Sequence, residues 1–292
     1  MTKRNTATIA AALVICTCCT ARVQSQQPSP ASTPASATVL VVARTKDGSP
    51  AELSPGDVEI KVDGKTALVQ EIRPMAGVPL HYVLLFDTSG SQHERFNLQK
   101  AQAVRLLSKV VRAARDQGML VAFNDKAYLA AQGTNPQELV DAITRERSVG
   151  GTAFYDAAIS AANRLAQAAD SAPRVMFILS DGQDNASQVN RYYAEQSLLN
   201  ARIRVYVIGQ GKPYRRGGEA LRLFSESTGG RAYFPARQED ESAALADIVN
   251  DLSNLFSVSY LAPYPPHRRL QKIEVRCKGK GVSLAAPQRV PD

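Results

Sequence analysis

Between residues 80 and 256, short apolar runs alternate with longer segments in which apolar residues recur at helical spacing. The apolar runs are closed by polar or glycine residues, which is typical of strands buried on both faces of a parallel sheet; they cover residues 82–86, 119–123, 175–179 and 205–209. Shorter runs predict an edge strand and a last strand at residues 128–131 and 232–234. Helical spacing predicts helices over residues 98–117, 136–145, 153–169, 194–201, 219–227 and 242–256. This alternation predicts an α/β fold, a doubly wound and mostly parallel sheet with helices on both faces.

The segments on either side of this region show a different pattern, in which apolar and polar residues alternate as in half-exposed strands. Strands are expected at residues 38–43, 58–62, 67–72, 258–261, 273–277 and 282–284. The dipeptide Asp63-Gly64 between two of them predicts a tight hairpin. Each segment is too short to fold alone. We therefore expect the N-terminal segment, 38–79, and the C-terminal segment, 257–292, to pair into a small, sandwich-like all-β module beside a domain over 80–256.

The first 21 residues have the pattern of an export signal. Lys3 and Arg4 are followed by an apolar stretch over residues 7–15, and small residues precede an expected cleavage after Ala21. The apolar stretch is too short to span a bilayer well, so we expect no transmembrane span in the mature chain. Residues 22–37 are rich in Pro, Ser, Ala and Gln, a composition that predicts a disordered linker.

Two other fates of the leader remain open, an uncleaved anchor and a lipoprotein signal. The second alternative rests on three cysteines that follow the apolar stretch, Cys16, Cys18 and Cys19. Removal of the leader leaves Cys277 as the single cysteine, which excludes an internal disulfide. Cys277 ends an alternating run and is predicted to be a buried strand residue.

The net charge of +8 does not indicate a nucleic-acid-binding protein. Without Lys3 and Arg4 the chain keeps 33 basic against 27 acidic residues, a net charge of +6, and this excess is diffuse. The small basic clusters at Arg215-Arg216 and at residues 267–269 are not interleaved with aromatic residues. We therefore expect no nucleic-acid partner.

Three turns carry oxygen donors that the predicted sheet brings to one edge. Asp87, Ser89 and Ser91 follow the run at 82–86, and Asp181 follows the run at 175–179. Thr152 follows two glycines, which allow a tight turn. Carboxyl ends of parallel strands lie at the same rim, where ligands of such sheets bind. Five oxygen donors predict an octahedral site for Mg²⁺, with Mn²⁺ or Ca²⁺ as alternatives.

The donor set favours recognition over catalysis. With only two carboxylates, Asp87 and Asp181, a bound dication keeps the capacity to accept a carboxylate from a partner. No histidine or glutamate in these turns is placed as a base, since His93 and Glu94 fall on a polar loop. A haloacid-dehalogenase-like phosphatase would need a second acid two residues after its aspartate, where this chain has Ser89.

A nucleotide-binding interpretation rests on Gly209-Gln210-Gly211 and is weaker still. This segment lacks the third glycine at the required spacing, and the next strand, over 232–234, is not directly followed by the required acidic residue.

The five donors together resemble the metal-ion-dependent adhesion site of the von Willebrand factor type A domain. The resemblance covers residues 80–256 and includes Asp87-Thr88-Ser89-Gly90-Ser91, then Thr152, then Asp181, in the order found in that family. It implies that the hydroxyls and Thr152 bind Mg²⁺ directly or through water and that an acidic residue of a partner completes the shell. It also implies that the last helix, here predicted over 242–256, moves when the site changes state.

The flanking segments resemble the acidobacterial-type group of exported proteins related to this domain. The resemblance rests on the leader, the turns at Asp47-Gly48 and Asp63-Gly64, and the segments at 259–264 and 272–275. We predict an exported, metal-dependent protein-binding module that is not an enzyme and whose protein ligand presents Asp or Glu. Its expected location is the periplasm, the cell surface or the medium. The alternative is an envelope assembly scaffold, in which the metal is structural and the β segments make the contacts.

Overall fold

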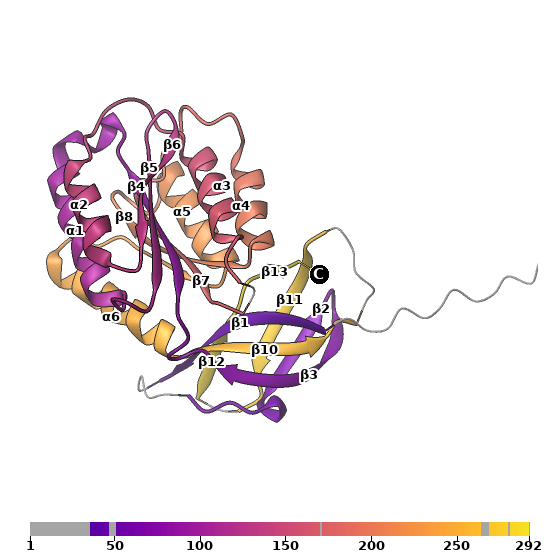
Figure 1. Cartoon of the computed structure of the whole chain (residues 1–292). Coiled ribbons are helices and arrows are strands. Elements are labelled where there is room, and N and C mark those ends of the chain that lie inside the picture. Colours follow the sequence, from indigo (N-terminus) through magenta and orange to yellow (C-terminus); the bar gives the residue numbers. More distant parts are fainter. Residues whose placement is uncertain (1–35, 47–50, 170, 264–268, 280, 292) are drawn as a thin grey trace, which may run out of the picture. The chain divides into compact units, whose positions relative to one another are not determined.

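A computed structural model of the protein describes residues 36–46, 51–169, 171–263, 269–279 and 281–291, which form two sheets (Figure 1). The predicted signal peptide and the linker as far as residue 35 lie outside the described residues. The larger unit of α/β structure contains the strands β4 (His81–Asp87), β5 (Gln117–Phe123), β6 (Ala127–Gly133), β7 (Arg174–Ser180), β8 (Ile203–Gly209) and β9 (Arg231–Tyr233). Their order is β6-β5-β4-β7-β8-β9, and only β6 runs antiparallel to its neighbour.

Helices cover both faces of this sheet, as the sequence predicts (Figure 1). One face carries α1 (Phe96–Val110), α2 (Pro136–Arg145) and α6 (Gln238–Ser253). The other carries α3 (Phe154–Leu165), α4 (Arg191–Asn200) and α5 (Arg216–Ser227). Strand β4 serves both layers, because Leu84 and Phe86 pack under the first set of helices and Val83 and Leu85 under the second. The unbroken apolar run of β4 thus reflects burial on two faces, which confirms the doubly wound α/β fold.

The terminal segments pair with each other, as expected, and form a curled antiparallel sheet. Its strands are β1 (Ser36–Thr45), β2 (Val58–Val62), β3 (Lys65–Pro74), β10 (Leu255–Leu261), β11 (Gln271–Cys277), β12 (Val282–Ala285) and β13 (Arg289–Val290). Their order is β12-β1-β10-β3-β2-β11-β13. Strand β10 lies between β1 and β3, so the two ends of the chain share one core. The all-β module is therefore confirmed, with its strands in one curled sheet.

The turn between β2 and β3 shows why its dipeptide predicts a hairpin. Asp63 and Gly64 have φ angles of 45° and 83°, and Val62 pairs with Lys65. Positive φ at both central residues gives the turn the twist that antiparallel strands need. Cys277, in contrast, is half-buried and not buried as predicted, because it is the last residue of β11.

The prediction that the first helix extends to residue 117 is wrong, because α1 ends at Val110. The Asp116 carboxylate accepts hydrogen bonds from the backbone N–H of Arg112 at 2.8 Å and of Leu80 at 2.9 Å. Ala114 adopts a φ of 60°, which interrupts the helical path. The Asp116 carboxylate therefore links the loop after α1 to the residue before β4. The apolar spacing alone would predict that the helix continues through this loop.

The last helix also ends earlier than predicted, at Ser253 in place of residue 256. The side chain of Asn254 donates to the Asn250 carbonyl at 3.0 Å and accepts from the backbone N–H of Ala51 at 3.1 Å. Leu255 already belongs to β10 and pairs with Val42. Strand β10 therefore spans the expected domain boundary between residues 256 and 257.

Candidate metal centre

The sheet brings the carboxyl ends of β4 and β7 to one rim, and the predicted donors lie in the turns that follow. Asp87 is the last residue of β4, and Asp181 directly follows β7, whose last residue is Ser180. Phe86 pairs with Leu179 in parallel register, so the two strands end side by side. The fold therefore positions the first and third turns together.

Asp87 is a buried carboxylate held by neutral donors. Its side chain is fully buried, its Oδ1 accepts from the backbone N–H of Ser89 at 2.9 Å, and its Oδ2 accepts from the Ser180 hydroxyl at 2.6 Å. Burial raises the pKa of Asp87 to about 6, and the negative charge of Asp181 adds to that rise. The influence of Asp181 on Asp87 places both carboxylates in one electrostatic environment.

The two serines of the first turn lie in contact with each other. Ser89 is fully buried and Ser91 is exposed, and their hydroxyl oxygens are 3.0 Å apart. The amide of Gln92 also donates to the Ser91 hydroxyl, at 3.4 Å. The first turn thus presents two hydroxyl oxygens next to a buried carboxylate, with one of them open to solvent.

The second turn is hydrogen-bonded to the first. The backbone N–H of Gly90 donates to the carbonyl of Gly150 at 3.0 Å, and the N–H of Val149 donates to the carbonyl of Thr88 at 2.8 Å. The Ser148 hydroxyl donates to a carbonyl of the same first turn, that of Ser89, at 2.6 Å. These bonds fix the backbone just before Thr152, which is itself buried.

The third turn is hydrogen-bonded to the second. The backbone N–H of Thr152 donates to the Asn185 side-chain oxygen at 2.8 Å, and the N–H of Asn185 donates back to the Thr152 carbonyl at 3.0 Å. The Asp184 carboxylate accepts from the N–H of Phe154 at 2.9 Å at the start of α3. The half-buried Asp181 accepts from the backbone and side chain of Gln183 at 3.0 and 3.1 Å.

The structure thus brings the three predicted turns together. At the first turn it links three of the five predicted residues through the Ser89 backbone N–H, which donates to Asp87, and through the contact between the Ser89 and Ser91 hydroxyls. Those three are Asp87, Ser89 and Ser91. Among the described residues, the Thr152 hydroxyl and the Asp181 carboxylate make no hydrogen bond to that group. Their place at the rim comes from the backbone bonds of their own turns.

Two further side chains, which the sequence analysis does not identify, form hydrogen bonds that hold this rim together. Ser180 binds Asp87 directly, and its position at the strand end, just before Asp181, was a usable signal. Gln99 is fully buried in α1, and its amide donates to the carbonyls of Asp87 at 3.1 Å and Leu179 at 3.0 Å. A glutamine inside a helical pattern carries no such signal, because its role depends on the distance between helix and sheet.

The donor set fits a hard divalent cation. It comprises two carboxylates and three hydroxyls, all oxygen ligands, which Mg²⁺ prefers. Among the described residues, no group of three or more His, Cys, Asp or Glu side chains forms a metal-binding cluster, so the hydroxyls are essential to any site here. A buried carboxylate with a raised pKa and neutral partners is also a natural neighbour for a positive charge.

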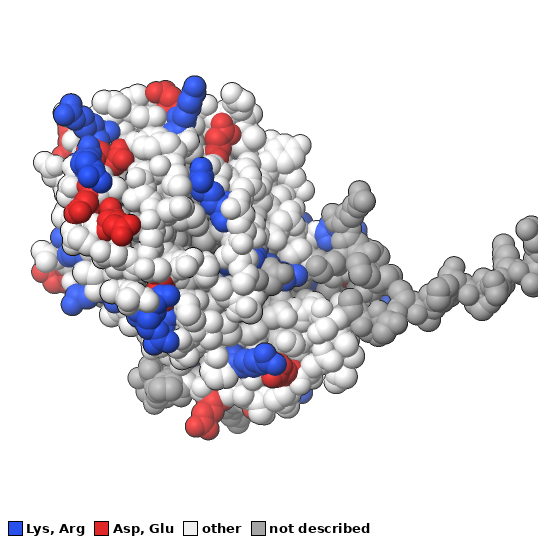
Figure 2. All heavy atoms as spheres, in the orientation of Figure 1, with Lys and Arg blue, Asp and Glu red and all other residues white. Residues whose placement is uncertain are grey.

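In the described part of the chain, no helix is both long and apolar enough to cross a bilayer. On the face shown in Figure 2, basic and acidic side chains are interspersed and do not gather into one basic patch. This distribution does not indicate nucleic-acid binding.

Solved structures with the same fold are only distantly similar in sequence. Proximal thread matrix protein 1 from the mussel byssus, solved with a zinc-occupied metal-ion-dependent adhesion site, is 17% identical over 64% of this chain and 48% of its own, with a TM-score of 0.51. A von Willebrand factor type A protein from Catenulispora acidiphila is 13% identical, covering 91% of this chain and 75% of its own, with a TM-score of 0.49. An aerotolerance-related membrane protein from Bacteroides fragilis is 16% identical, covering 59% and 98%, with a TM-score of 0.49.

A search of curated proteins found no match. The model of the von Willebrand factor type A domain matches residues 82–251, which is more than half of the chain and includes all six strands of the α/β sheet and all three turns of the rim. The chain therefore belongs to the von Willebrand factor type A domain family.

Proposed function

We propose that the protein is a metal-dependent protein-binding module whose ligand presents a carboxylate at the sheet rim. Domains of this family often mediate protein interactions, often bind a divalent metal, and are generally not enzymes. In this proposal Asp87, Ser89, Ser91, Thr152 and Asp181 hold Mg²⁺. The bound metal supplies a Lewis-acid position that accepts an Asp or Glu oxygen from the partner.

One observation carries this proposal most directly, the buried Asp87 carboxylate flanked by two hydroxyls. Its partners are the Ser89 N–H and the Ser180 hydroxyl, all neutral, and burial raises its pKa. Burying a charged carboxylate without a cationic side chain beside it costs folding free energy, and a bound cation offsets that cost. The backbone bonds that join the three turns hold the remaining donors on the same rim.

The predicted signal peptide over residues 1–21 leads us to propose that the protein works outside the cytoplasm, in the periplasm, at the cell surface or in the medium. The narrower resemblance to acidobacterial-type exported proteins stays a prediction.

Calorimetric titration of Mg²⁺ into the EDTA-treated full chain tests the metal site. We expect saturable binding by the wild type and at least a hundredfold weaker binding by Asp181→Ala, because one of two carboxylates is lost. Among the described residues the Asp181 carboxylate accepts hydrogen bonds from Gln183 alone, so this variant should stay folded. Glu94→Ala removes an exposed carboxylate from the neighbouring loop and should bind Mg²⁺ like the wild type. A Mg²⁺ affinity of Asp181→Ala equal to that of the wild type would contradict the proposed metal site.

A second step separates recognition from a scaffold in which the metal is structural. Partners captured by the immobilised full chain in Mg²⁺ are eluted with EDTA, and capture is repeated with Asp181→Ala. We expect metal-dependent partners to disappear in the variant while its circular dichroism spectrum stays unchanged. A partner that the folded variant keeps would point to the β segments as the binding surface.

A further inference from the structure

A cavity lies at the end of the α/β sheet opposite to the candidate metal centre. Its volume is about 320 Å³, within the range of small-molecule sites. Arg174 and Ile203, the first residues of β7 and β8, line it, together with residues of β1, β3, β10 and β13. The cavity is therefore built jointly by the amino ends of the parallel strands and by the all-β module, and it shares no residue with the metal centre.

The lining of this cavity combines positive charge with apolar surface. Five arginines line it, Arg73, Arg174, Arg202, Arg204 and Arg289. Val39, Leu40, Met75 and Val290 contribute apolar side chains. None of the described lining residues is Asp or Glu. A ligand that suits this lining carries negative charge on one part and apolar surface on another.

Arg204 supplies the most buried of these charges. Its side chain is 2% exposed, and its guanidinium donates to the backbone carbonyls of Gly229, of Leu40 at 3.0 Å and of Ala285 at 3.1 Å. Among the described residues it makes no hydrogen bond with a carboxylate, and its Nε has no hydrogen-bond partner. Carbonyl dipoles orient the guanidinium but do not neutralise its charge.

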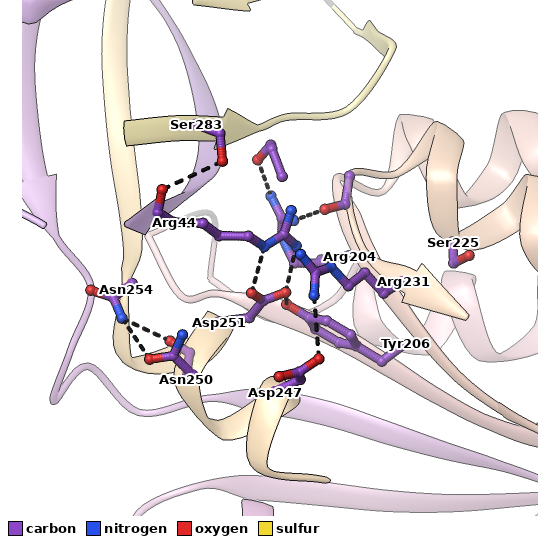
Figure 3. A network of polar contacts seen from close by, with 12 residues as sticks. Arg44, Arg204, Tyr206, Ser225, Arg231, Asp247, Asn250, Asp251, Asn254 and Ser283 are labelled. Atoms are coloured by element: carbon purple, nitrogen blue, oxygen red, sulfur yellow. Dashed lines mark hydrogen bonds and ion pairs between the residues drawn. The ribbon is translucent and has the colours of Figure 1, made fainter. Parts of the chain in front are cut away.

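Asp251, the acid whose charge acts on Arg204, is already engaged by another arginine (Figure 3). Both oxygens of Asp251 accept from Arg44, at 2.8 and 2.6 Å, and the Tyr206 hydroxyl donates to Asp251 at 3.2 Å. Within the described residues, the hydrogen bonds of this buried carboxylate thus go to Arg44 and Tyr206, and Asp251 acts on Arg204 only through its charge. Burial lowers the pKa of Arg204, although the charge of Asp251 opposes that change. The second acid in this region, Asp247, pairs with Arg231 at 3.4 Å.

We propose that this cavity binds a small amphiphile that carries a carboxylate or phosphate group. Arg204 and the rim arginine Arg289 recognise the oxyanion, because guanidinium groups match both carboxylate and phosphate geometry. Arg73, which also lines the cavity, is already paired with Glu71 at 2.5 Å. The apolar body of the ligand packs against Met75 and Val290. This site is independent of the metal-binding function proposed above, since it lies at the other end of the strands.

Four probes, titrated calorimetrically into the full chain, test the two halves of the proposal. They are decanoate, decyl phosphate, inorganic phosphate and decanol. We expect saturable 1:1 binding of decyl phosphate, decanoate or both, and the tighter of the two identifies the anionic group. Decanol and inorganic phosphate should bind at least tenfold more weakly. Equal binding of decanol would overturn the role of the arginines, and equal binding of inorganic phosphate would overturn the role of the apolar surface.

Variants then locate the binding in the cavity. Ser257→Phe fills part of it from β10, and Arg289→Glu reverses a charge at its exposed rim. Each should weaken binding of the tighter amphiphile at least tenfold, as should Arg204→Gln if it folds. Arg145→Glu makes the same charge reversal on α2, outside the cavity, and should leave the affinity unchanged. Unchanged affinity in both folded variants, Ser257→Phe and Arg289→Glu, or no binding of either amphiphile to the wild type, would overturn the proposal.

Discussion

The two ends of the parallel sheet differ in the sign of their buried charge. At the carboxyl ends of β4 and β7, the buried carboxylate of Asp87 has hydroxyl and N–H partners. At the amino ends of β7 and β8, the guanidinium of Arg204 has carbonyl partners, and Arg174 likewise donates to the Ala201 carbonyl at 3.1 Å. Asp87 and Arg204 are thus buried charges whose hydrogen-bond partners, among the described residues, are neutral groups.

This difference in charge explains how a single sheet can support two separate ligand sites. Polar dipoles keep a buried ion in place but leave much of its charge uncompensated, so a ligand of opposite sign is stabilised there. The carboxyl end therefore suits a cation and the amino end an anion. The apolar interiors of β4, β7 and β8 separate the two ends, and each site is expected to respond to its own ligand.

The largest expected effect concerns Asp251, the buried carboxylate that binds Arg44. Asp251→Ala leaves Arg44 and the Tyr206 hydroxyl without this partner, removes the negative charge that acts on the buried Arg204, and should lower the free energy of unfolding by about 3–5 kcal/mol. Asp247→Ala, which breaks an ion pair between half-exposed side chains, should cost less than about 1 kcal/mol. Urea denaturation of both variants measures the difference. Similar losses in the two variants would show that the buried charges are better compensated than the contacts indicate.

The next effect concerns metal binding at the carboxyl end. Mg²⁺ at a hundred times its dissociation constant should raise the free energy of unfolding by about 2.7 kcal/mol, because it binds only the folded chain. EDTA should abolish this gain, and Asp181→Ala should show no gain at the same Mg²⁺ concentration. Urea denaturation with and without Mg²⁺ measures it, and a wild type that does not respond to saturating Mg²⁺ argues against the site.

Loss of a neutral partner of Asp87 should have a smaller effect. Ser180→Ala removes the hydroxyl that donates to Asp87 and should lower the free energy of unfolding by about 2 kcal/mol, since hydrogen bonds to charged groups are the stronger ones. Ser225→Ala is a matched control, because this buried hydroxyl donates only to the Arg222 carbonyl of its own helix. Its expected cost is about 1 kcal/mol or less. A larger loss of unfolding free energy in Ser225→Ala than in Ser180→Ala, measured by chemical denaturation, would contradict the stronger hydrogen bond to the charged Asp87.

The smallest expected effect on stability comes from two glycine substitutions, and their comparison distinguishes backbone strain from a change in the geometry of the metal site. Gly150 has a φ of 80°, and a Cβ there would meet the Asp125 carboxylate, so Gly150→Ala should cost about 1–2 kcal/mol and also weaken Mg²⁺ binding. Gly64 has a φ of 83° in the β2–β3 turn, with nothing within 4 Å of a Cβ. Gly64→Ala should therefore cost a similar amount without any change in Mg²⁺ affinity. Equal Mg²⁺ affinities in the two variants would show that the second turn does not shape the site.

The sequence predicts the layers of this fold better than the ends of its elements. Unbroken apolar runs identify the central strands, and helical spacing identifies the helices between them. The end of α1 depends on Asp116, whose carboxylate bonds to Leu80, 36 residues away, and no local pattern reveals such a bond. The same applies to the end of α6, where Asn254 bonds to Ala51, 203 residues away.

The two ligand sites differ in how far the sequence indicates them. Apart from Thr152, the predicted metal ligands fall at or directly after the ends of recognisable strands, so residue order and the parallel sheet predict that they share one rim. The arginine-rich cavity depends on pairs such as Arg44 with Asp251, 207 residues apart, and on the Arg204 bond to the Leu40 carbonyl, 164 residues apart. Arg44 and Arg204 lie directly outside the predicted strands at 38–43 and 205–209, so they look like solvent-facing residues until the all-β module is placed beside them.

The most direct test of this account is a crossed calorimetric titration of Asp181→Ala and Ser257→Phe with Mg²⁺ and with decyl phosphate or decanoate, whichever the wild type binds more tightly. Two sites of opposite charge predict that Asp181→Ala loses Mg²⁺ binding and keeps the amphiphile, whereas Ser257→Phe keeps Mg²⁺ and loses the amphiphile. A wild type that binds neither ligand, or a folded variant that loses both together, would contradict the separation of the two ends of the sheet.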